Sequence, residues 1–177
     1  MTTLLFETHS WSEDNELGLA SGWRGGALAP RGRGLAAALG DRRRHDGLAA
    51  VFCSDLVRAV ETTQLAFAGS DIPILLDWRL RECDFGDWTG RPAADFQDTR
   101  LRFLDAPYPN GESWRQAIQR VGRFLPDLHP RWTGARVLVI GHTATRWAFD
   151  HFLRGQPLEA LLAAPFDWQE GWEYTVA

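Results

Sequence analysis

The chain has 177 residues, of which 45% are hydrophobic, and we expect one domain over residues 1–177 because this length supports one full core. A formal net charge of −4 argues against nucleic acid or an anionic membrane surface as partner, since neither attracts an acidic chain. The N-terminus has no leader-like pattern, and no run of about 18 apolar residues occurs. The sequence therefore predicts neither secretion nor a membrane span, and a cytoplasmic location.

The first predicted element is a short buried strand. Four consecutive strand formers, Thr3 to Phe6, end at Glu7, Thr8 and His9, which we expect in a loop. In open α/β sheets the ligand crevice lies beyond the carboxyl ends of the strands, so His9 could be a nucleophile, a base or a metal ligand. A lone histidine in such a place is more often structural, and a partner elsewhere in the chain is needed.

A long loop and a helix follow. Residues Ser10 to Leu28 are polar and glycine-rich without a regular period, which indicates a loop of the kind that often binds ligands. Residues Pro30 to Arg43 predict a helix with Leu35, Ala38 and Leu39 at core spacing. Its basic end suits the helix dipole better than it suits a nucleic-acid site.

The next strand, Leu48 to Cys53, leads into a helix that carries Arg58 in its first turn. Ser54 and Asp55 are candidates for the helix cap. Because the dipole disfavours a cation in this turn, Arg58 points to an anionic partner, with a surface salt bridge as the alternative.

A third strand is predicted over Ile72 to Leu76, and a structured loop over Leu80 to Pro92, where charges, aromatic residues and glycines are dense. Glu82 lies in this loop. A carboxylate among apolar neighbours can have its pKa raised enough to act as a general acid, although the loop alone does not establish that role.

The second half of the chain predicts several further elements: a short helix over 95–104, a helix over 112–128, a strand over 136–141, a helix over 144–153 and an edge strand over 172–176. The strand over 136–141 ends at His142 and Thr143, so a second strand end delivers a second histidine. In the helix that follows, Trp147, Ala148 and Phe152 are expected to face inward. Nine tryptophans are many for this length, and we expect some to line a pocket.

Alternating strands and helices predict a three-layer α/β/α sandwich with a mainly parallel sheet. In that fold His9 and His142 can meet at one edge of the sheet. Together with Arg58 and Glu82 they suit phosphoryl transfer. One imidazole can attack phosphorus, the cationic groups can neutralise phosphoryl oxygens, and the carboxyl group can protonate the leaving alkoxide.

The order and spacing of five segments resemble the histidine phosphatase superfamily, also called phosphoglycerate mutase-like. The segments are FETHS, SDLVRAVETT, LRECDFGDWTG, NGES and VLVIGHT, and the resemblance runs almost end to end. It implies the phosphoglycerate mutase-like fold and metal-independent phosphoryl transfer on a small-molecule phosphate ester, with no cofactor.

The resemblance also implies roles for individual residues. His9 would be the nucleophile that forms a phosphohistidine, Glu82 the proton donor, and Arg58 and His142 part of the phosphate pocket. Asn15 and the backbone amide of Thr143 would complete that pocket.

Three positions depart from the family pattern: Thr8 replaces an arginine, and Ser10 and Thr143 each replace a glycine. A charge-assisted hydrogen bond from arginine contributes about 1.5–3 kcal/mol, so its loss should cost about one to two orders of magnitude unless it is replaced. Arg24 and Arg146 are the nearest candidates to replace it, with a surface position as the commoner alternative for each.

Two classes of function stay open. We favour a phosphatase with a phosphohistidine intermediate, because the chain is shorter than typical mutases of this fold and lacks the insertion that encloses a mutase intermediate. The alternative is a divergent member that binds an anionic ligand, or does other chemistry in the same pocket, without efficient phosphoryl transfer; Thr8 is its main support. A phosphate mutase is a weaker third. The sequence specifies neither the substrate nor an oligomeric state.

Overall fold

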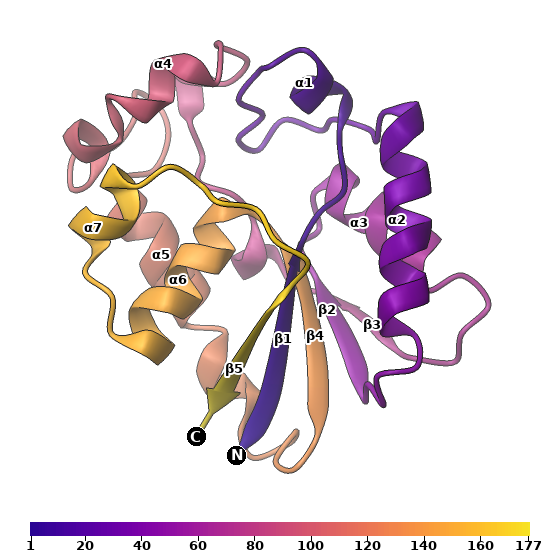
Figure 1. The fold of residues 1–177 in the computed structure, drawn as a ribbon. Coiled ribbons are helices and arrows are strands. Elements are labelled where there is room, and N and C mark those ends of the chain that lie inside the picture. The colour runs from indigo at the N-terminus through magenta and orange to yellow at the C-terminus, as the bar shows by residue number, and fades with distance from the viewer.

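The computed structural model describes residues 1–177 and contains a five-stranded sheet in the order β3-β2-β4-β1-β5. The strands are β1 (Thr2–Thr8), β2 (Ala50–Cys53), β3 (Ile74–Leu76), β4 (Arg136–Gly141) and β5 (Trp172–Val176). The first four are mutually parallel, and β5 pairs antiparallel with β1 at one edge. The predicted mainly parallel sheet and the predicted edge strand are confirmed (Figure 1).

Helices cover both faces of the sheet (Figure 1). One layer holds α2 (Pro30–Arg43) and α3 (Val57–Ala66); the other holds α5 (Trp114–Gly122), α6 (Thr143–Arg154) and α7 (Leu158–Ala163). Side chains alternate along each strand, so Leu4 and Phe6 join the larger core under α5 to α7, whereas Leu5 joins the smaller core under α2 and α3. This arrangement confirms the three-layer sandwich. None of the helices combines the length and the apolar character that a bilayer span requires.

The inward face of α2 differs from the prediction. Leu35 is 53% exposed and Ala38 is also exposed, whereas Gly32, Ala36, Leu39 and Gly40 are buried. A Cβ atom on either glycine would collide with a backbone carbonyl oxygen of a neighbouring segment. Small residues therefore mark the packed face of α2, because they allow close approach to the rest of the chain.

Four other predictions need correction. The loop over 10–28 contains a short helix, α1 (Glu13–Glu16), which begins with a capping box between Ser12 and Asn15. The helix predicted over 112–128 ends at Gly122 and is followed by a 3₁₀ turn over Leu125–Leu128, since Pro126 has no N–H to continue the helix. The short helix over 95–104 is split into α4 (Ala94–Gln97) and a 3₁₀ turn over Arg100–Phe103. Phe152 is exposed rather than inward.

Three adjacent strands end together at the carboxyl edge of the sheet. Glu7 and Thr8 still belong to β1, and Thr8 lies opposite Gly141 of β4. His9 then donates its backbone N–H to the Gly141 carbonyl at 2.9 Å, and Ser54, after β2, donates to the Ile140 carbonyl at 3.1 Å. The residues that leave β1, β2 and β4 are thereby held side by side.

Candidate active site

The two strand-end histidines meet as predicted. The ring centroids of His9 and His142 lie 5.0 Å apart. The Nδ1 atom of His9 is 2.7 Å from the carbonyl oxygen of Ser10, which can only accept a hydrogen bond. Nδ1 therefore carries the proton, and Nε2 carries the lone pair that a nucleophile needs. Ser10 itself is fixed, because its hydroxyl donates to the Gly32 carbonyl at 2.6 Å.

Arg58 lies between the two imidazoles and is only 2% exposed. Its guanidinium donates from Nε to His9 Nε2 and from one terminal nitrogen to His142 Nδ1, both at 3.3 Å. Carbonyl oxygens of Gly22 and Arg24 accept from the same group at 2.9 and 3.1 Å. The carbonyl contacts fix a cation next to His9 Nε2, where an anion can bind.

The surroundings of the two imidazole rings determine their tautomers and their charge. Because His142 Nδ1 accepts from Arg58, its Nε2 carries the proton and donates to the Ser54 hydroxyl at 2.9 Å. Burial, and then the charge of Arg58, lower the pKa of His9 to about 3 and that of His142 well below its usual value. Both imidazoles are neutral at about pH 7, so His9 is free to act as a nucleophile.

Glu82 lies against the N-terminus of α6. Its Oε1 accepts from the amides of Cys83 at 2.9 Å and Ala144 at 3.0 Å, and its Oε2 accepts from the amide of Thr143 at 3.2 Å. Burial raises the pKa of Glu82, and this effect outweighs those hydrogen bonds and the charge of Arg58. The carboxyl group is therefore easier to protonate than an ordinary glutamate, as a general acid requires.

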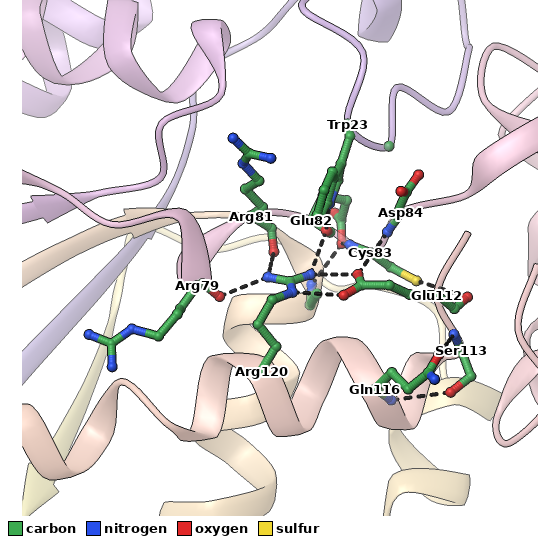
Figure 2. A network of polar contacts seen from close by, with 12 residues as sticks. Trp23, Arg79, Arg81, Glu82, Cys83, Asp84, Glu112, Ser113, Gln116 and Arg120 are labelled. Atoms are coloured by element: carbon green, nitrogen blue, oxygen red, sulfur yellow. Dashed lines mark hydrogen bonds and ion pairs between the residues drawn. The ribbon is translucent and has the colours of Figure 1, made fainter. Parts of the chain in front are cut away.

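A buried ion pair holds the backbone of the loop that carries Glu82 (Figure 2). Arg120, 4% exposed, binds Glu112 with two hydrogen bonds of 2.8 and 2.7 Å. The same guanidinium donates to the carbonyls of Arg81 at 3.1 Å and Glu82 at 2.9 Å. Trp23 donates its indole N–H to the Glu82 carbonyl at 2.7 Å from the other side. The position of Glu82 is thus fixed by side chains of two other segments.

A cavity of about 630 Å³ opens beside the two histidines. Of the residues predicted for the site, those that line it are Thr8, His9, Ser10, Asn15, His142 and Thr143. The Asn15 side chain is engaged in capping α1, and the Thr143 amide in binding Glu82. The Thr8 hydroxyl accepts a hydrogen bond from the indole of Trp168 at 3.1 Å.

The side chains of Arg24 and Arg146, the candidates to replace the missing arginine, lie away from the cavity. The Arg24 side chain forms an ion pair with Asp14, and only its backbone carbonyl serves the site, through Arg58. Arg146 pairs with Asp150 at 2.6 Å and stacks on Trp172, 4.2 Å from the ring centroid. Neither guanidinium lines the cavity beside His9.

Sequence reasoning missed several residues of the site. Ser54 was expected only as a helix cap, although it lies in the segment that carries Arg58. Arg120 and Trp168 had no local signal, because each acts on a segment far away in the chain. No group of three or more His, Cys, Asp or Glu side chains is arranged to hold a metal ion.

Comparisons with known proteins bear on this site. The family model described as "Histidine phosphatase superfamily (branch 1)" matches residues 5–169. An adenosylcobalamin/alpha-ribazole phosphatase from Salmonella typhimurium is 31% identical over 142 residues, 76% of this chain and 70% of that protein. A 2,3-bisphosphoglycerate-dependent phosphoglycerate mutase from Methylobacterium radiotolerans is 34% identical over 154 residues, 78% of this chain and 73% of that protein.

A solved structure is also similar to this chain in fold. Bacillus stearothermophilus YhfR has a TM-score of 0.84 and 26% sequence identity, with 100% of this chain and 96% of that chain covered. The two curated relatives are thus a phosphatase and a phosphoglycerate mutase, and the solved structure shares the fold of this chain.

Proposed function

Because the chain belongs to the histidine phosphatase superfamily, we propose that it hydrolyses a small-molecule phosphomonoester through a phosphohistidine on His9, without a metal ion. The observation that carries the proposal is the pair of neutral imidazoles on either side of Arg58, with the His9 Nε2 lone pair next to the buried cation. This geometry suits attack on an anionic phosphoryl group.

In the first step His9 Nε2 forms a bond to phosphorus while the bond from phosphorus to the ester oxygen breaks. The Nε–H of Arg58, which contacts Nε2 in the free protein, then donates to a phosphoryl oxygen. Glu82 gives its proton to the leaving alkoxide, so that a neutral alcohol departs.

In the second step a water molecule attacks phosphorus, and the ionised Glu82 takes up its proton. The bond between phosphorus and Nε2 breaks, inorganic phosphate leaves, and His9 regains its lone pair. The hydrogen bond from Nδ1 to the Ser10 carbonyl keeps the same tautomer through both steps.

The charges of the cavity favour hydrolysis over a mutase reaction. The substrate of a phosphoglycerate mutase carries a carboxylate as well as a phosphate, and this second anion needs a cation. Arg42, the one arginine of the cavity wall, lies 3.5 Å from Glu7 and 3.6 Å from Glu170. It is already offset by two carboxylates, which favours a substrate with a single anionic group.

The test uses an acid-quenched reaction with a ³²P-labelled phosphomonoester. We expect wild-type protein treated with a chelator to form an acid-labile, base-stable phosphoenzyme, and His9→Ala to lose both the label and about 10³-fold or more in kcat. His45→Ala changes an exposed histidine and should retain both. Chelator inhibition reversed by Mg²⁺, or full activity in His9→Ala, would contradict the proposal.

A further inference from the structure

The cavity beside the histidines has an apolar wall that phosphoryl transfer does not require. Leu35 and Leu39 of α2 form one side, and Phe166 and Trp168 of the segment between α7 and β5 form the other. Leu35 is 53% and Trp168 is 58% exposed, so this wall presents large apolar side chains to solvent. A volume of about 630 Å³ lies within the range of roughly 300–1,000 Å³ for pockets that enclose small organic ligands.

Trp168 is held in place by the residue next to the nucleophile. Its indole N–H donates to the Thr8 hydroxyl at 3.1 Å, although 160 positions separate the two residues. Residues 164–171 form no helix or strand and cross above the carboxyl end of β1 (Figure 1). The Glu170 carbonyl, which accepts from Arg43 of α2 at 3.3 Å, ties the same segment to α2.

The charged side chains of the cavity wall are paired with one another, so they leave little charge to bind a ligand. Besides its contact with Arg42, Glu7 accepts a hydrogen bond of 2.8 Å from Arg43, so its charge is matched within the protein. Glu170 is paired with Arg42. A second anion or a cation on the ligand would have to break these pairs, whereas an uncharged ring buries apolar surface against Trp168 and Leu35.

We propose that the alcohol part of the substrate is an uncharged aromatic group that binds between α2 and residues 164–171, against Trp168, and that Thr8 positions this indole. The proposal rests on the proposed function, since it places the leaving group beside His9. Thr8 acts through Trp168 and is a positioning residue. It occupies the place where the family pattern has an arginine, and its hydroxyl contributes to recognition of the alcohol.

The kinetic test compares two alkyl esters that make the same demand on Glu82, 2-naphthylmethyl phosphate and methyl phosphate. Trp168→Ala should lower kcat/KM for the naphthyl ester by about tenfold or more, mainly through KM, and change the methyl ester by less than about twofold. Thr8→Val keeps the shape of threonine but lacks the acceptor, and should shift the same ratio in the same direction. Trp78→Ala, at an exposed tryptophan outside the cavity, is the matched control.

Two outcomes would overturn the inference. If Trp168→Ala leaves the ratio between the two esters unchanged, the aromatic wall does not bind the alcohol. If Thr8→Val lowers both esters equally, its hydroxyl serves the phosphoryl group instead of Trp168.

A binding measurement separates this inference from the proposed function. Titration calorimetry with 2-naphthylmethylphosphonate and methylphosphonate, neither of which is hydrolysed, should show the naphthyl compound bound at least about tenfold more tightly by wild type but not by Trp168→Ala. This result in a protein without phosphatase activity would refute only the proposed function. Equal affinity of wild type for both phosphonates would refute only the present inference.

Discussion

Glu82 is subject to opposing effects on its acidity. Three backbone N–H groups favour its carboxylate form, as an anion at the N-terminus of α6 should be favoured. Burial acts the other way and dominates, so the pKa of Glu82 is raised. A raised pKa keeps the proton on the carboxyl group to higher pH, and the acid form is lost as the pH rises through that value.

Glu82→Gln should therefore distinguish leaving groups. An alkyl alkoxide needs a proton to leave, whereas p-nitrophenolate leaves without one. We expect kcat/KM to fall by about 10²-fold or more for an alkyl phosphate and much less for p-nitrophenyl phosphate. In the wild type, activity on the alkyl ester should decline with rising pH more steeply than activity on the aryl ester. Equal losses on both esters would assign Glu82 to structure or binding.

Thr8→Arg tests two alternatives: the pocket merely lacks the arginine of the family pattern, or it has been rearranged around the contact between Thr8 and Trp168. A restored guanidinium would raise kcat/KM by about tenfold or more if the pocket merely lacks a charge. We expect a loss instead, because Thr8 binds Trp168 and the longer side chain would displace the indole. Steady-state kinetics on several phosphomonoesters checks this, and a clear gain on generic substrates would contradict the expectation.

At the scale of elements, the position of α2 depends on glycines. Gly40 packs against the Ala66 carbonyl, so Gly40→Ala should lower the free energy of unfolding by about 1–3 kcal/mol, the usual cost of overpacking. Gly34 lies in the same helix with open space around it, and Gly34→Ala should instead raise stability by about 0.5–1 kcal/mol. Urea denaturation measures both. Equal stabilities of the two variants would show that α2 is not held at this distance by close packing.

Helix α2 shows which features of the fold the sequence predicts and which it does not. Hydrophobic spacing correctly placed α2 along the chain but assigned Leu35 to the core, because a periodic pattern gives weight to large side chains and none to glycine. The meeting of His9 and His142 was predictable, since parallel strands end at one edge. The contact of Thr8 with Trp168 was not, because only the path of the folded chain brings positions so far apart together.

At the scale of the whole molecule, the site makes stability depend on pH. His9 and His142 are buried as neutral rings beside Arg58, so their pKa values in the folded state lie below the value of about 6.5 in the unfolded chain. Below about pH 6.5 these two histidines bind protons in the unfolded chain but remain neutral in the folded protein. The contribution of the two histidines to stability is therefore fully present above about pH 6.5 and is lost as the pH falls toward their folded-state pKa values.

The size of this effect can be measured by urea denaturation at pH 7.5, 6.0 and 5.0. Each histidine should contribute a slope of up to about 1.4 kcal/mol per pH unit below about pH 6.5. The raised pKa of Glu82 gives a contribution of opposite sign, which is present at low pH and is lost as the pH rises through that value. The carboxyl groups of Asp14 and Asp55, whose pKa values are lowered, lose their contribution only at lower pH. His142→Gln should flatten the slope, because glutamine does not titrate, while His45→Gln, at an exposed position, should not. If the slope is unchanged in His142→Gln, His142 is not neutral in the folded protein. The neutral tautomer assigned to His142, with its proton on Nε2, would then be wrong.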